Sequence, residues 1–165
     1  MGLHSIRVET GGDVARPSPR QVERFIESLG SPGGSTFLVL NGDGEDRYMQ
    51  AAGSGGRYVL ESRDIYGEGF AHLRAGVPVG RKTTIHFRHS CPRSIHGKPG
   101  CPLEIDEGSV QSLAAVKEAL RHYAATGERP PGFHWENVTK EFQEPPPAET
   151  DPDEIVPIRP KDRPS

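Results

Sequence analysis

Long apolar runs are absent from this sequence of 165 residues, and none approaches the ~20 residues that a membrane-spanning helix requires. The first residues, MGLHSIRVETGGD, lack the apolar core of a secretory signal peptide. Cysteine is scarce as well, since the chain has only Cys91 and Cys101. We therefore expect a cytoplasmic protein with no membrane contact, and we do not expect these two cysteines to form a stable disulfide.

Apolar side chains are few overall: hydrophobic residues make up 33% of the chain, and the mean hydropathy is −0.63. The C-terminus explains part of this shortage, because from Gln143 the sequence reads QEPPPAETDPDEIVPIRPKDRPS. Such a segment cannot bury enough surface to offset the entropy lost on ordering. We predict a single α+β domain over residues 1–142, followed by a proline-rich, disordered or extended tail over residues 143–165.

An excess of positive charge is also missing. Residues 143–165 contain six acidic and three basic residues, whereas the whole chain contains 23 and 20, so residues 1–142 carry 17 of each sign. Binding to nucleic acid depends on a basic surface that neutralises phosphates. This balance argues against nucleic acid as the partner.

The motifs of common catalytic sites are missing too. The glycine-rich stretch GDGEDRYMQAAGSGG has no lysine followed by Ser or Thr, and no helical pattern follows it as in a phosphate-binding loop. No Gly-x-Ser-x-Gly elbow occurs. We therefore expect a non-catalytic protein without a cofactor, apart from the zinc hypothesis below.

The elements that the sequence does predict are short strands and two amphipathic helices. Ser18, Pro19 and Gln21 form a helix start, and the first helix ends at Gly30. Tight glycine turns then separate extended segments at residues 35–41, 46–53, 56–64 and 69–76, and the β-branched run 81–90 suggests a fifth strand. A second helix begins near Ser109 and ends at Gly127, and residues 133–138 alternate like a strand.

This order indicates a two-layer α+β fold. We predict an antiparallel meander of about five or six strands, with both helices packed on one face of the sheet. The alternation in YVLESR would place Val59, Glu61 and Arg63 on one face of the sheet and Tyr58, Leu60 and Ser62 on the other.

The stretch HFRHSCPRSIHGKPGC concentrates three histidines and both cysteines. Zinc binds Cys and His, so the candidate metal ligands are His86, His89, Cys91, His96 and Cys101. Their spacing matches no common zinc pattern, and on a strand His86 and His89 would point to opposite faces. A solvated loop is the alternative, and a reactive cysteine beside His89 or His96 is a third.

Exposed aromatic and charged residues suggest a protein interface, because Tyr, Trp and Arg are enriched in such surfaces. The candidates for binding a partner are Tyr48, Arg57, Arg63, Tyr66, Glu68, His72, Trp135 and Glu136. Packing in a half-buried sheet is the competing interpretation for the aromatic members.

Two blocks of the sequence resemble a known family. The first is DRYMQAAGSGGRYVLESRD with FAHLRAG, and the second is SLAAVKEALRHYAATGERPPGFHWENV. Together they resemble the Imm1 family of immunity proteins from bacterial polymorphic toxin systems. The matching positions are Tyr48, Met49, Gln50, Val59, Leu60, Glu61, Arg74, Trp135 and Glu136. A long insertion after Arg74 departs from the family's pattern.

The resemblance implies a small α+β immunity protein that binds a cognate bacterial toxin and neutralises it without catalysis. Two alternatives remain. One is a zinc-binding module or metal-dependent enzyme built on the stretch from His86 to Cys101. The other is an adaptor that docks through the acidic tail around Ile155, Val156 and Ile158.

Overall fold

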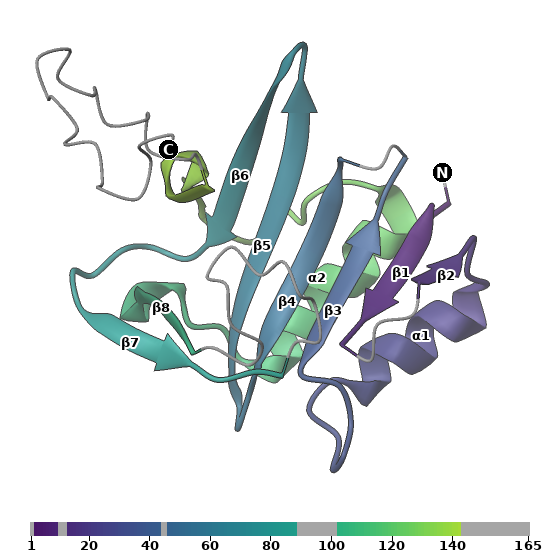
Figure 1. The fold of residues 1–165 in the computed structure, drawn as a ribbon, viewed down its shortest axis with the longest axis horizontal. Coiled ribbons are helices and arrows are strands. Elements are labelled where there is room, and N and C mark those ends of the chain that lie inside the picture. The colour runs from purple at the N-terminus through teal and green to yellow at the C-terminus, as the bar shows by residue number, and fades with distance from the viewer. Residues whose placement is uncertain (1, 10–12, 44–45, 89–101, 143–165) are drawn as a thin grey trace, which may run out of the picture.

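The computed structural model describes residues 2–9, 13–43, 46–88 and 102–142. Their dominant element is a seven-stranded antiparallel sheet with the strand order β2-β1-β3-β4-β5-β6-β9 (Figure 1). Its strands are β1 (Ser5–Val8), β2 (Asp13–Ala15), β3 (Phe37–Asn41), β4 (Tyr48–Ser54), β5 (Arg57–Tyr66), β6 (Gly69–Ala75) and β9 (Trp135–Asn137). The predicted α+β class, with a β3-β4-β5-β6 meander, is confirmed.

Both helices form for the local reasons that the sequence indicated. In α1 (Pro19–Ser28), the Ser18 hydroxyl accepts from the Gln21 backbone N–H, while the Gln21 side chain accepts from the Ser18 N–H. Helix α2 (Leu113–Thr126) begins at the N-cap Ser112 and ends at Gly127, which has a φ of +73°. The predicted start near Ser109 is instead a short 3₁₀ turn, η1 (Glu107–Ser109).

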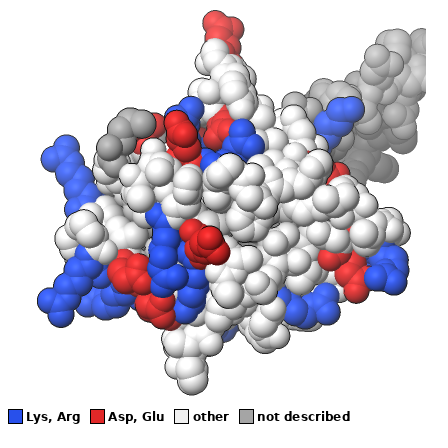
Figure 2. All heavy atoms as spheres, turned by 180° about the vertical axis from the view of Figure 1, so that it is seen from behind, with Lys and Arg blue, Asp and Glu red and all other residues white. Residues whose placement is uncertain are grey.

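The two helices cover one face of the sheet (Figure 1). Val22 and Ile26 of α1 and Val116 and Leu120 of α2 pack there against apolar residues of the strands such as Leu40. On the outer side, Arg121 pairs with Glu23 at 2.6 Å and Lys117 pairs with Glu27 at 3.2 Å. Figure 2 accordingly shows acidic and basic side chains next to one another on this side of the molecule.

The strand alternation divides β5 between two cores as predicted. Tyr58 and Leu60 belong to the helix-side core, whereas Val59 belongs to a second core on the opposite face. A separate two-stranded sheet, β7 (Lys82–Ile85) with β8 (Leu103–Asp106), covers this second core through Ile85 and Ile105.

Three details of the architecture differ from the prediction. The main sheet has seven strands because β1 and β2, which are not among the strands predicted above, extend it at one edge, whereas the strand predicted over residues 133–138 is its opposite edge strand, β9. The strand expected within residues 81–90 is β7, but it pairs with β8 outside the main sheet. Residues 103–106, where no strand was predicted, form β8. The predicted tail, residues 143–165, lies outside the described residues.

Gly76 follows β6 and packs against the backbone of η1, which lies at the other end of the segment that contains β7 and β8. Its φ is +133°, and an added Cβ would lie 2.4 Å from the carbonyl oxygen of Gly108 and 2.5 Å from Cα of Ser109. The backbone therefore leaves the sheet and returns to it at a contact that only glycine permits. The close approach fixes where the β7–β8 excursion sits against the main sheet.

In the described part of the chain, no helix is both long enough and apolar enough to cross a membrane.

Replacing Gly76 with alanine should lower the free energy of unfolding by about 2 kcal/mol or more, because the Cβ meets backbone that cannot rotate away. Urea denaturation measures this change. Gly69→Ala is the control: its Cβ would lie 3.7 Å from the Tyr66 carbonyl oxygen, an ordinary contact, so its effect should stay within about 1 kcal/mol. Equal stability of the two variants would contradict the close approach.

Candidate functional site

The face of the sheet opposite the helices carries polar side chains in two transverse rows. Direct cross-strand partners lie on the same face of a sheet, so the register identifies each row. The first row crosses all seven strands through Asp13, Arg7, Val39, Gln50, Glu61, Arg74 and Glu136. The second row runs beside it through Ser5, Asn41, Tyr48, Arg63 and His72. We call this surface, made of the two rows, the polar face.

Glu61 is the centre of the polar face, and it is 3% exposed. Its carboxylate accepts hydrogen bonds from Gln50 Nε2 at 2.7 Å and from Arg74 Nε at 2.8 Å. His72 Nε2 lies 3.1 Å from the same carboxylate. Because an ionised carboxylate only accepts hydrogen bonds, His72 Nε2 carries the proton in this contact. Three neighbouring strands are therefore joined through one buried anion.

The electrostatics of Glu61 favour its ionised form. Burial by itself raises the pKa of this carboxyl group. The hydrogen bond from His72 and the charge of Arg74 outweigh burial, and together they lower the pKa from 4.5 to about 2. Glu61 is therefore ionised throughout the physiological pH range, and its charge holds His72 and Arg74 in place.

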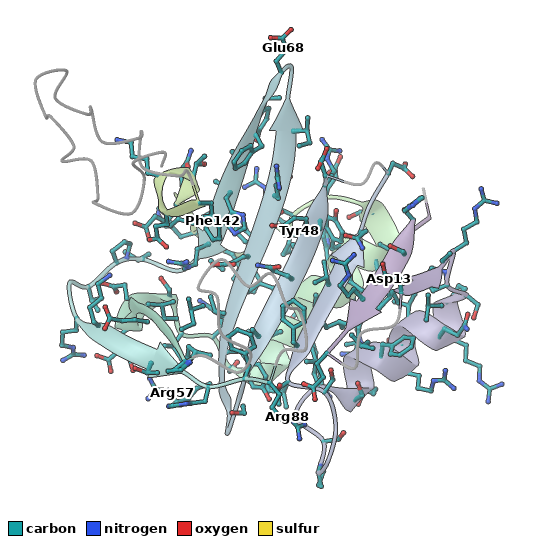
Figure 3. All side chains as sticks on the ribbon, viewed as in Figure 1. Asp13, Tyr48, Arg57, Glu68, Arg88 and Phe142 are labelled. Carbon is teal, nitrogen blue, oxygen red and sulfur yellow. The ribbon has the colours of Figure 1, made fainter. Side chains whose placement is uncertain are left out.

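A short 3₁₀ helix, η2 (Thr139–Phe142), covers the His72 side of this network (Figure 3). The Phe142 ring centroid lies 3.7 Å from that of His72, and the Glu141 carboxylate accepts from both terminal nitrogens of Arg74, at 2.9 and 3.2 Å. The His72 backbone N–H also donates to Thr139 Oγ1 at 3.0 Å. These contacts fix η2 against β6.

Tyr48, His72 and Glu61 are residue types that an acid–base relay uses, but their arrangement differs from that of a catalytic relay. His72 is 1% exposed, and Nε2 is bonded to Glu61. The other ring nitrogen, Nδ1, lies 3.4 Å from the Tyr48 hydroxyl. Both nitrogens therefore face protein groups, and Phe142 covers the ring. In this arrangement His72 orders its neighbours rather than presenting a proton to a substrate.

Arg63 lies between Tyr48 and His72 and is held differently from Arg74. Its guanidinium carbon lies 4.1 Å from the Phe70 ring centroid. Burial raises the pKa of Tyr48, the Glu61 charge raises it further, and the charge of Arg63 and its hydrogen bond to Tyr48 oppose the rise. Arg63 Nε is buried and has no hydrogen-bond partner among the described residues.

A hollow of about 510 Å³ adjoins Tyr48 on the β1–β3–β4 part of the polar face. Phe37 and Val39, both largely buried, contribute apolar lining. Arg7 and Asp13 also line the hollow and pair with each other at 2.9 Å. Apolar side chains beside polar neighbours are the composition that protein interfaces show at their centre and rim.

The structure divides the predicted partner-binding residues into three groups. Tyr48, Arg63, His72 and Glu136 lie on the polar face, although His72 is buried. Trp135 packs on the helix-side core, with its ring 5.8 Å from that of Phe133.

The remaining three predicted residues lie away from the polar-face network. Tyr66 and Glu68 lie at the tip of the β5–β6 hairpin, and Arg57 lies at the opposite end of β5, where it donates to Thr83 (Figure 3). The eight residues do not form one surface.

Sequence reasoning about the interface did not select the residues that organise the polar face, Gln50, Glu61, Arg74, Glu141 and Phe142. Gln50, Glu61 and Arg74 are among the positions that carry the Imm1 resemblance, but they were not predicted to contact a partner. The register supplies a signal for them: a charged residue in the alternating stretch YVLESR shares a face with the buried Val59.

The candidate zinc ligands fall almost entirely outside the described residues. This holds for His89, Cys91, His96 and Cys101. His86 is exposed, and its backbone carbonyl accepts a hydrogen bond from the Ser54 hydroxyl at 2.8 Å. Within the described ranges, no group of three or more His, Cys, Asp or Glu residues is arranged to hold a metal. The zinc hypothesis therefore stays a prediction.

Comparison of the sequence with models of protein families and with curated proteins finds no significant match. The Imm1 resemblance consequently stays a prediction as well.

Glu61→Gln should lower the free energy of unfolding at pH 7 by about 3 kcal/mol, the amount that corresponds to a pKa of about 2 against 4.5 in the unfolded chain. Because the folded pKa is the lower one, this stabilisation is present above pH 4.5 and is lost as the pH falls towards 2. Urea denaturation across this range should therefore show a shallower loss for the variant than for the wild type.

The control for this measurement is Glu23→Gln, which removes a carboxylate from an exposed pair with Arg121. Its effect should stay below about 1 kcal/mol, because water already solvates such pairs. If Glu61→Gln and the wild type lost stability in parallel between pH 4.5 and 2, the pKa of Glu61 in the folded protein would not lie below its value in the unfolded chain.

The zinc hypothesis predicts about one equivalent of zinc in protein purified without a histidine tag, and a lower melting temperature after chelation, because structural zinc contributes to folding. Elemental analysis and thermal denaturation measure the two effects. Less than roughly a tenth of an equivalent, with unchanged melting after chelation, would eliminate the hypothesis.

Proposed function

We propose that this chain is a non-catalytic binding protein, an immunity protein that binds a cognate bacterial toxin and neutralises it. The observation that carries the proposal is the polar face itself. The two helices cover the opposite face (Figure 1). The polar face places an aromatic ring, charged groups and a hollow with both polar and apolar lining on one sheet.

The rigidity of the face supports this function. Binding costs less when the contacting side chains are already fixed, because fewer rotamers are lost on association. Tyr48 is positioned by contacts with His72 and Arg63, and His72 is in turn held by Glu61. The buried network therefore prepares the exposed part of the face for a partner.

The buried titratable groups of the network also support binding over catalysis. Glu61 is taken by three donors, and Arg74 is shared between Glu61 and Glu141. Groups so engaged stabilise a surface and are poorly placed to exchange protons with a substrate. No observation on the described residues favours the alternative function of a zinc-dependent enzyme.

The test is co-expression with the product of the adjacent gene. If that product is a toxin, this chain should restore growth of cells that produce it and should co-purify with a catalytically inactive form of it. The control is this chain carrying Tyr48→Ala and Arg63→Ala, which should protect less while remaining folded. Failure of the wild-type chain both to protect cells and to form a complex would contradict the proposal.

A further inference from the structure

The polar face contains one arginine, Arg63, that forms no ion pair with the described residues. Arg7 pairs with Asp13, and Arg74 pairs with Glu61 and Glu141. Arg63 makes no ion pair among the described residues, and its buried Nε has no acceptor there. A buried donor on a charged group is costly to leave unsatisfied. A partner cannot reach this buried atom, so a new acceptor must come to the terminal nitrogens of the half-buried Arg63, whose charge pairs with no carboxylate among the described residues.

The guanidinium of Arg63 is held in a fixed orientation. It stacks over the Phe70 ring at 4.1 Å, and Arg63 is the direct cross-strand neighbour of Tyr48. A planar guanidinium fixed on an aromatic ring retains in-plane N–H donors, and their geometry matches the two oxygens of a carboxylate. Arginine and tyrosine are also the residue types that most often dominate the energy of protein interfaces.

The charges around Arg63 decide which anion it can receive. Glu61 lies two residues along the same strand, and the Glu61–Arg74–Glu141 group carries one more negative than positive charge. Removing a doubly charged phosphate from water costs more than removing a carboxylate, and a site whose positive potential is reduced by nearby carboxylates offsets less of that cost. The surroundings therefore favour a carboxylate over a phosphate, and a protein over a nucleic acid.

We propose that Arg63, flanked by Tyr48 and Phe70, is the anchoring site for an acidic side chain, Asp or Glu, of the partner protein. This inference rests on the proposed function, and it specifies where the partner binds and by what chemistry. An acidic residue seated on Arg63 would lie beside the hollow next to Tyr48, which could receive a neighbouring apolar side chain of the partner.

Calorimetric titration with the inactive product of the adjacent gene tests this proposal. Arg63→Gln should weaken binding roughly 10- to 100-fold, the range expected for loss of a charge-assisted pair. Arg63→Lys should show a smaller loss, because it keeps the charge but not the planar fork. The matched control is Arg57→Gln on the same strand, which should leave the affinity unchanged because Arg57 lies at the far end of β5 and bonds Thr83.

A charge exchange identifies the occupant and remains informative if Arg63→Gln folds poorly. The acidic residues of the partner are replaced one at a time by arginine, and each variant is titrated with Arg63→Glu. For one of these partner variants, Arg63→Glu should bind at least tenfold more tightly than it binds the unchanged partner. Recovery for none of them would overturn the proposal.

The acidic tail of the chain itself is the competing source of a carboxylate. In a full-length variant, the six acidic residues of residues 143–165 are replaced by their amides. Adding Arg63→Gln to this variant should weaken binding to the partner by the same factor as in the wild-type chain. Disappearance of the effect in that variant would assign the carboxylate to the tail and overturn the proposal.

The outcomes distinguish failure of the anchoring site at Arg63 from failure of the proposed function. If the wild-type chain binds the toxin but Arg63→Gln binds it equally well, the anchoring site is wrong and the proposed function stands. If the wild-type chain does not bind, the proposed function is wrong and the inference is overturned with it.

Discussion

The ionised carboxylate of Glu61 is the interaction on which the polar face depends. A buried charge is tolerated only where hydrogen bonds and an opposite charge compensate for its lost hydration. Gln50, His72 and Arg74 provide that compensation from the strands on either side. Glu61 thereby joins β4, β5 and β6 through side chains as well as through the backbone, and Arg74 extends the link to Glu141 of η2.

The buried network positions the side chains in the exposed part of the polar face. His72 faces Glu61 with one nitrogen and Tyr48 with the other, so a fixed anion positions an aromatic ring nearer the surface. Arg63 occupies the register position between Tyr48 and His72 and stacks on Phe70, and its buried Nε has no acceptor among the described residues. A surface of this kind is suited to recognising a macromolecule, because its contacts are fixed before the partner arrives. The helix side differs, since Lys117 and Arg121 there already pair with Glu27 and Glu23.

Much of the fold follows from local sequence signals, because capping, turns and alternation act over a few residues. The capping box at Ser18 and the ending of α2 at Gly127 were predictable for this reason, as were the two faces of β5. The pairing of β7 with β8 was not, since a strand's partner depends on contacts across the intervening segment. The site was less accessible still. Glu61 looks like any solvent-facing residue of a strand until the register places it beside Gln50 and Arg74.

Hydroxyl-radical footprinting of the chain, alone and bound to the inactive product of the adjacent gene, tests most directly whether the polar face is the binding surface. Oxidation of Tyr48 and Phe70, both half-buried in the free chain, should fall on complex formation. Oxidation of Phe25 on α1, which is half-buried on the helix side, should stay the same. Unchanged oxidation of Tyr48 and Phe70 together with protection of Phe25 would place the partner on the helices and contradict the account.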